Sequence, residues 1–266
     1  MKKIVIVGLV LGCLGLVTMA AADTVSGNDV GTVVKSYEEP GVALLRGFAF
    51  DFNNEDHHIA DVCIDPDWPP YPTDYPRIMI TYADKNADDG FSYFVEHRRT
   101  TANGVVEATC NFSNCVGTCS CTLVAPPAPS YVFALRGFRT VFTGAGNDHE
   151  LKGIGVWRDG NVARIGYRDG NGDDKFQGFV EYAWLSPGLV EATGRKFLAG
   201  VGDADEVSLP AANRTVIGGF SINYSDGDRY VDELGVWIND TSVLMELNDK
   251  NDDDQFNGFV DWVRLY

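Results

Sequence analysis

The chain repeats one pattern three times, and this repetition constrains its fold more than any other feature of the sequence. Each copy opens with a Gly-Phe pair that begins an apolar run. The three pairs are Gly47-Phe48, Gly137-Phe138 and Gly219-Phe220. Three equivalent aspartates further along, Asp84, Asp169 and Asp249, are spaced by 85 and then by 80 residues. A period that recurs in this way predicts one supersecondary unit that is built three times.

Each copy is predicted to form four antiparallel strands. Apolar and polar residues alternate with period two, and Gly, Asn and Asp separate the runs, which is typical of antiparallel strands. The second strand ends at Trp157 in copy two and at Trp237 in copy three, and we expect both rings to pack in the core. Copy one differs there, because residues 62–64 lead into a Pro-rich insertion over residues 65–76. The predicted fold class is all-β, with three internal repeats of antiparallel strands.

Two architectures fit three such copies. Three sheets can pack around a pseudo-threefold axis, which resembles the general plan of β-prism lectins, or three β-sandwiches can follow one another in tandem. A unit of about 50 residues buries little apolar surface by itself, so we expect one shared core. Copy three ends without the connector that follows the other two copies. We therefore expect residues 24–34 to supply the missing strand and to close the ring by pairing the two ends of the chain.

The first segment of the chain has the features of an export signal. Lys2 and Lys3, a short apolar run and three alanines up to Ala22 have the order of a secretory signal peptide. The apolar run is shorter than the roughly 20 residues that a membrane span needs. We expect a signal peptide over residues 1–22, no membrane span, and an extracellular or periplasmic protein. The remaining predicted segments are repeat 1 over 23–110, a Cys- and Pro-rich connector over 111–130, repeat 2 over 131–194, a connector over 195–213 and repeat 3 over 214–266.

Charge and cysteine content agree with export. The formal net charge is −17 and would fall to −19 without Lys2 and Lys3, which disfavours nucleic acid and anionic membranes as partners. Four cysteines crowd one connector with a spacing that suits zinc poorly, so we predict local disulfides. They are Cys110, Cys115, Cys119 and Cys121. Together with Cys63 they make five cysteines after the leader, so one must be unpaired.

An acidic loop lies between the third and fourth strands of each copy. Positions 1, 3, 5 and 6 of every loop carry oxygen-bearing side chains. The twelve candidate ligands are Asp84, Asn86, Asp88, Asp89, Asp169, Asn171, Asp173, Asp174, Asp249, Asn251, Asp253 and Asp254. Calcium takes six to eight oxygen ligands, and alternate residues of a tight turn can direct their carboxylates at one centre. The sequence therefore predicts calcium as a cofactor.

These loops resemble the first half of an EF-hand-type Asp-x-Asn-x-Asp loop. Position 6 is Asp rather than Gly, the flanks are strands, and position 12 is valine in every copy. An acidic residue follows one place later, as Glu96, Glu181 or Asp261, on the opposite face of the strand. The alternative is a set of charged turns, because Asp and Asn favour turns without any metal. Three carboxylates within six residues, repeated three times, favour calcium because unpaired like charges repel.

The sequence shows no defined catalytic set. The acidic residues recur in every copy, whereas a glycosidase uses one pair, and no nucleophile elbow or zinc-hydrolase His pair is present. Trp68, Tyr71 and Tyr75 in the insertion of copy one could contact a ligand, or the loop could fold over its own sheet. We expect a non-enzymatic, calcium-binding, lectin- or adhesin-like module for a glycan or cell-surface ligand. The alternatives are a calcium-rigidified structural or matrix protein and a secreted glycoside hydrolase.

Overall fold

The computed structural model describes residues 22–36, 41–52, 59–68, 77–84, 90–100, 103–143, 151–168, 175–201, 204–210, 212–224, 231–249 and 255–266. The predicted leader therefore lies outside the described residues except for Ala22, where the first strand begins. These parts form strands β1 to β18 and two short 3-10 helices, Pro187–Leu189 and Ala212–Arg214. Within them, no helix is long and apolar enough to cross a membrane.

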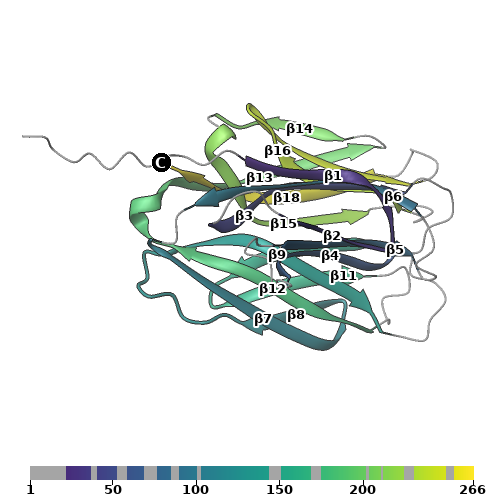
Figure 1. Ribbon diagram of the computed structural model, residues 1–266, viewed down its shortest axis with the longest axis horizontal. Helices are drawn as coiled ribbons and strands as arrows, with labels where there is room; N and C mark the ends of the chain where they lie inside the picture. Colours follow the sequence, from purple (N-terminus) through teal and green to yellow (C-terminus); the bar gives the residue numbers. More distant parts are fainter. Residues whose placement is uncertain are drawn as a thin grey trace, which may run out of the picture.

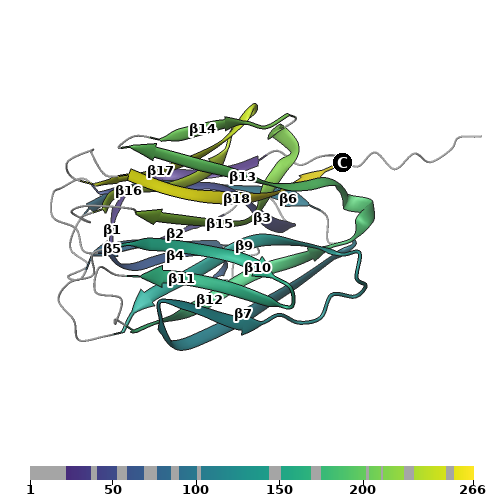
Figure 2. The same ribbon diagram turned by 180° about the vertical axis from the view of Figure 1, so that it is seen from behind.

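The strands form three six-stranded antiparallel sheets (Figure 1). The strand order of sheet A is β1 (Ala22–Val30), β6 (Gly90–Thr100), β3 (Val42–Phe52), β16 (Val231–Ile238), β17 (Ser242–Asp249) and β14 (Asp205–Ser208). The order of sheet B is β2 (Thr32–Ser36), β5 (Arg77–Asp84), β4 (Ile59–Trp68), β9 (Val132–Phe142), β12 (Lys175–Leu185) and β7 (Val105–Val116). Sheet C, which can be followed in Figure 2, has the order β13 (Val190–Val201), β18 (Gln255–Leu265), β15 (Thr215–Tyr224), β10 (Gly153–Asp159), β11 (Val162–Arg168) and β8 (Thr118–Thr122).

The three sheets are joined by a pseudo-threefold exchange of strands. Six consecutive strands make one unit, and each unit gives three strands to one sheet and three to the next. Neighbouring units join where β4 pairs with β9, β10 with β15, and β16 with β3. Because every sheet contains strands from two units, the chain cannot be divided into three tandem sandwiches. The predicted all-β fold with three repeats is confirmed, in its prism-like form.

The N-terminal segment forms strands, as predicted, but it does not close the ring. β1 pairs with β6 and β2 pairs with β5, so both strands stay within the first unit. β1 and β2 correspond to β7 and β8 of the second unit. They also correspond to β13 and β14 of the third unit. The ring closes instead through β16 and β3, so the expected pairing of the two chain ends is wrong. The reason is that the connector strands precede each repeat rather than follow it.

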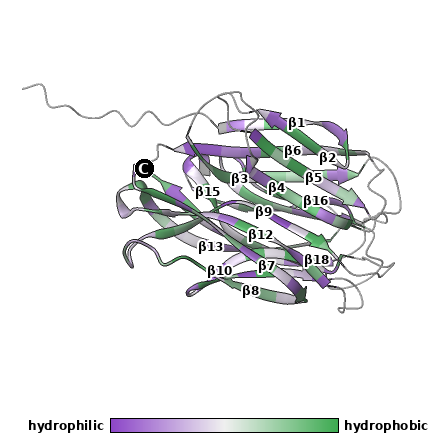
Figure 3. Cartoon of the chain, turned by 60° about the horizontal axis from the view of Figure 1, so that its bottom comes forward, coloured by the Kyte–Doolittle hydropathy of each residue, from purple (hydrophilic) through white to green (hydrophobic). Residues whose placement is uncertain are grey.

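A large hydrophobic core fills the space between the three sheets, and a smaller apolar cluster around Leu44 and Leu185 lies apart from it. The phenylalanines of the repeated Gly-Phe pairs meet at the centre of the large core, where the ring centroids of Phe48, Phe138 and Phe220 lie 5.3 to 5.6 Å apart. All three rings are fully buried. Green apolar and purple polar stretches alternate along the strands in Figure 3, as expected when one face of each sheet packs in a core. The predicted shared core is therefore present.

The glycine of each Gly-Phe pair is explained by a close approach between strands. A β-bulge precedes it in every copy, where the register shifts at Arg46, Arg136 and Gly218. A Cβ atom on Gly137 would lie 2.6 Å from Pro66 Cδ, and one on Gly219 would lie 3.0 Å from Trp157 Cα. Only a residue without a side chain fits such a position, so the repeated glycine marks the crossing of two units.

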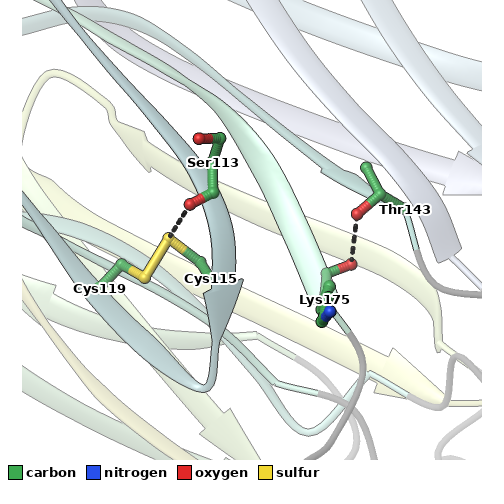
Figure 4. Close-up of a disulfide and its surroundings, with 5 residues drawn as sticks. All are labelled: Ser113, Cys115, Cys119, Thr143 and Lys175. Carbon is green, nitrogen blue, oxygen red and sulfur yellow. Dashed lines mark hydrogen bonds between the residues drawn. A yellow bond between two sulfur atoms is a disulfide. The ribbon is translucent and has the colours of Figure 1, made fainter.

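Two disulfides fasten the strands of the Cys-rich connector, as predicted. Cys110 pairs with Cys121, and Cys115 pairs with Cys119, with Cα–Cα separations of 6.0 and 5.7 Å. The second bridge lies at the β7–β8 turn, where Cys115 Sγ contacts the carbonyl oxygen of Ser113 (Figure 4). In the same view, the Thr143 hydroxyl donates a hydrogen bond to the Lys175 carbonyl. Among the described residues, the free cysteine is Cys63, which is buried in β4. Disulfides of this kind are typical of proteins outside the reducing cytoplasm.

Candidate binding face and predicted sites

Most of the predicted calcium ligands lie outside the described residues. Asp84 ends β5 with a side chain that is 7% exposed, and Asp249 ends β17. The other ten, from Asn86 to Asp254, fall outside the described ranges. In the described part of the chain, no group of three or more His, Cys, Asp or Glu residues is arranged to hold a metal ion. Calcium binding therefore stays a prediction.

Strand register places the strand ends that flank all three acidic loops at one end of the molecule. In the first unit, Phe52 pairs with Phe91, so the end of β3 adjoins the start of β6 after the loop. Across units, Asp61 pairs with Val141, which brings the start of β4 beside the end of β9. The equivalent pairings of β10 with β15 and of β16 with β3 repeat this arrangement. The strand ends that carry the loops are thus gathered at a single end.

The predicted ligand-contact residues of copy one are only partly described. The insertion predicted over residues 65–76 is not all loop, because β4 continues to Trp68, which pairs with Arg77. The side chain of Trp68 and the whole of Tyr71 and Tyr75 lie outside the described residues. The segment from Asp65 to Asp67 lies against its own sheet, as the alternative interpretation proposed, because Arg136 of β9 binds Asp67. The ligand contact predicted for Trp68, Tyr71 and Tyr75 therefore stays a prediction.

The outer faces of the three sheets differ at equivalent positions. Ile64, Val156 and Val236 take equivalent core positions opposite the central phenylalanines. The next residue in each strand therefore points outward, and it is Asp65 in sheet B, Trp157 in sheet C and Trp237 in sheet A. The expectation that Trp157 and Trp237 pack in the core is wrong, because both rings lie partly exposed on the outer faces. This position thus carries a tryptophan on sheets A and C and an aspartate on sheet B.

Sheet C presents an aromatic outer face. Phe197 of β13 lies opposite Phe259 of β18, and their ring centroids are 6.4 Å apart. Trp157 of β10 contacts Phe259 edge to face at 5.9 Å. The Phe197 side chain is 72% exposed, which is unusual for a large aromatic ring. The residues beside these rings are small, because Ser221 of β15 pairs with Phe259 and Gly155 of β10 pairs with Ser221.

A charged pair borders this aromatic cluster, which consists of Trp157, Phe197 and Phe259. Arg195 donates two hydrogen bonds to Asp261, at 2.6 and 2.8 Å. Its guanidinium also lies over the Phe259 ring, 3.7 Å from the centroid. The ion pair raises the pKa of Arg195 further, so the guanidinium stays charged. The pair fixes Phe259 by a cation–π contact and leaves polar groups at the edge of the aromatic face.

Sheet A has a shallow acidic hollow on its outer face. A pocket of about 200 Å³ is lined by Asp51, Glu233 and Glu246, together with the ring of Phe94. Asn248 donates a hydrogen bond to Glu233 at its side. The hollow is small beside the pockets of several hundred Å³ that enclose small-molecule ligands. It adds negative surface without forming an enclosed site.

Sheet B carries a buried charged cluster around Arg136. The guanidinium donates to both oxygens of Asp67, at 2.7 and 2.6 Å, and lies 2.7 Å from Glu107. Glu181 of β12 faces the same group, and it is only 6% exposed. Burial, reinforced by Asp65 and Asp67 and opposed by Arg136, raises the pKa of Glu181 to about 8. Burial and the neighbouring carboxylates therefore favour the protonated form of Glu181.

Sequence reasoning missed the aromatic cluster because its residues come from two repeats and a connector. Trp157 belongs to repeat 2, Phe259 to repeat 3 and Phe197 to the connector over 195–213. The alternation of side chains along a strand could have found part of the cluster. Phe256 and Phe259 are three residues apart in one strand, so their side chains point to opposite faces and cannot both face the core. Phe256 is buried and Phe259 is partly exposed.

Comparison with known proteins adds little to this picture. No protein-family model matches the chain, and no curated protein matches it. Among solved structures, the chain is similar to the major capsid protein P2 from bacteriophage PM2, with 10% identity and a TM-score of 0.22. That match covers 92% of this chain and 98% of the capsid protein. A likeness at this level does not bear on function.

Proposed function

We propose that this is an exported, non-enzymatic glycan-binding protein whose ligand lies on the outer face of sheet C. The observation that carries the proposal is the aromatic cluster of Trp157, Phe197 and Phe259, with Phe197 72% exposed. Aromatic rings stack on the apolar faces of sugar rings, and polar groups beside them bond to hydroxyls. Arg195 and Asp261 supply such groups at the edge of the cluster.

The arrangement favours one extended site over three equivalent ones. Only sheet C carries all three aromatic residues of the cluster. In sheet A, Phe94 and Trp237 correspond to Phe259 and Trp157, but Ser26 takes the place of Phe197. In sheet B, Asp65 takes the place of Trp157. A single flat face suits a polysaccharide chain that passes over several strands. Calcium, in this proposal, rigidifies the loops at the end of the prism and takes no direct part in the sugar contact.

The glycoside-hydrolase alternative has one observation in its favour. Glu181 is a carboxyl group with a raised pKa beside other carboxylates, which is a feature of general acids. However, Oε2 of Glu181 is inaccessible to solvent, and a general acid must reach the glycosidic oxygen. The exposed aromatic cluster therefore supports a binding function better than a catalytic one.

A glycan array probed with residues 23–266 tests the proposal. Wild-type protein should bind at least one polysaccharide or oligosaccharide, and Phe197→Ala should weaken that binding by about tenfold, as expected for loss of a central aromatic contact. Val201→Ala is the matched control, because Val201 is exposed on the same strand and lies beyond the cluster. Equal binding by wild type and F197A, or no binding to any glycan, would contradict the proposal.

A further inference from the structure

The end of β4 crosses the outer face of sheet B as a short strap, which consists of Asp65, Pro66 and Asp67. Pro66 is buried against Gly137 of β9. Asp67 accepts two hydrogen bonds from Arg136, and its own amide donates to Asp65 at 3.0 Å. The strap is paired with β5 at either end, where Asp65 lies opposite Met79 and Trp68 lies opposite Arg77. Between these pairs, the Arg136 guanidinium holds Asp67 on the sheet.

We propose that this strap is a pH-sensitive element, clamped on sheet B while Glu181 is protonated and released when Glu181 ionises. The proposal goes beyond the glycan-binding face, since it concerns a different sheet. It rests on the geometry around Arg136 and on the difference between Glu181 and its two counterparts.

The counterparts of Glu181 each have an arginine partner. Glu96 of sheet A forms a buried ion pair with Arg46, and Asp261 of sheet C forms the bidentate pair with Arg195. In sheet B, the arginine equivalent to Arg46 is Arg136, but Asp67 and Glu107 occupy its donors. Oε2 of Glu181 is consequently buried and makes no hydrogen bond with any described residue.

The groups around Glu181 favour its neutral form. Asp65 and Asp67 approach from β4, Glu107 from β7 and Arg136 from β9, so three carboxylates oppose one guanidinium. Burial is the largest cause that raises the pKa of Glu181, to about 8, and the neighbouring carboxylates raise it further. The thiol of Cys63, whose pKa burial also raises, faces Glu181 and is neutral at pH 7.

Ionisation changes the balance at Arg136. A buried carboxylate without a hydrogen bond is costly, and it repels Asp65 and Asp67. An ion pair with Arg136 would stabilise the ionised carboxylate, as the ion pair with Arg46 does for Glu96 in sheet A. Asp67 holds both terminal nitrogens of Arg136, whereas Glu107 contacts one of them, so a turn of the guanidinium toward Glu181 weakens the bonds to Asp67 and releases the strap.

Cys63 provides a built-in reporter of release. It is fully buried on the same outer face, two residues before the strap, and it is the free cysteine of the described chain. The other described cysteines are in disulfides. An alkylating reagent such as iodoacetamide should therefore modify Cys63 only when the end of β4 opens.

The experiment measures the rate of Cys63 alkylation from pH 6 to pH 9 in residues 23–266, for wild type and Glu181→Gln. Each rate is divided by that of the unfolded protein at the same pH, which removes the titration of the thiol. Between pH 7 and pH 9 the wild-type ratio should rise about tenfold relative to E181Q, because the ionised fraction of a group with a pKa of about 8 grows by that factor. Parallel profiles for the two proteins would overturn the proposal.

Two further variants keep the test decisive. Glu96→Gln removes the equivalent acid of sheet A and should leave the pH profile at Cys63 unchanged. Asp65→Asn retains Glu181 but removes a neighbouring charge, so the midpoint of the profile should move to lower pH. An unchanged midpoint in D65N would contradict the proposal, even if E181Q failed to fold.

Discussion

At the scale of single residues, side chains at equivalent positions of the three units can have different partners. Val95, Val180 and Val260 fill the core alike, and the acid that follows each of them points outward, as the alternation predicted. The partner of that acid could not be predicted. Copies one and two have Arg46 and Arg136 at one equivalent position, whereas copy three has Gly218 there, and its acid Asp261 pairs with Arg195 from another strand. Alternation fixes which way a side chain points, whereas its partner depends on how the units meet.

The crossing at Gly137 gives a test at this scale. Gly137→Ala should lower the free energy of unfolding by about 1–3 kcal/mol, because the new methyl group would overlap Pro66 and the backbone of β4. Chemical denaturation measures the change. Gly188→Ala is the control, since a Cβ there meets nothing within 4 Å. Equal stability of the two variants would mean that the strands do not cross as described.

His97 predicts a loss of stability in acid. The ring is fully buried and donates a hydrogen bond from Nε2 to the Arg136 carbonyl at 2.9 Å, and burial lowers its pKa to about 3. Between pH 6.5 and 3 the unfolded chain binds a proton that the folded protein does not, so stability falls as pH falls through this window. In His97→Gln, which keeps a donor but does not titrate, the melting temperature should depend less steeply on pH. Identical slopes would contradict this role.

At the scale of strands, most elements follow from local pattern. The alternating runs predicted the strands of all three repeats, because each sheet has one apolar face. Strands β7, β8, β13 and β14 fell within segments that the sequence divided between repeats and connectors. The insertion of copy one was predicted as loop throughout, since proline is rare in strands, but Pro66 sits at an irregularity in the pairing of β4 with β5.

The disulfides of the β7–β8 hairpin should contribute measurably to stability. Cys110→Ser with Cys121→Ser should lower the free energy of unfolding by about 2–4 kcal/mol, because the bridge restricts the unfolded chain. Cys115→Ser with Cys119→Ser opens a shorter loop and should cost less. Urea denaturation without reductant measures both. A larger loss from the shorter loop would show that loop length does not determine the effect.

At the scale of the whole molecule, three units share one core, and the strand ends that flank their acidic loops lie at one end. The repetition in the sequence predicted the shared core, because one unit is too small to bury enough apolar surface. It did not predict which strands close the ring of three units, because that depends on which unit contributes strands to which sheet. It also could not place the aromatic cluster, whose members meet only after repeats 2 and 3 have exchanged strands.

Calcium should stabilise the whole fold if the loops bind it. Thermal melts of residues 23–266 in EDTA should shift upward when calcium is restored in excess and should not shift comparably with magnesium. Asp84→Asn, Asp169→Asn and Asp249→Asn, made singly, should each remove part of the shift. If the melting temperature does not change with calcium, the loops are charged turns without a metal. That result would not bear on the proposed binding face of sheet C.

The most direct test of the proposed binding face is hydroxyl-radical footprinting of the protein with and without the best ligand from the glycan array. Aromatic side chains are oxidised readily when exposed, so each sheet carries its own reporter. The proposal predicts that the ligand protects Phe197, Phe259 and Trp157, while Phe94 and Trp237 on sheet A keep their rates. Protection on sheet A alone, or none on sheet C, would contradict the assignment of the ligand to this face.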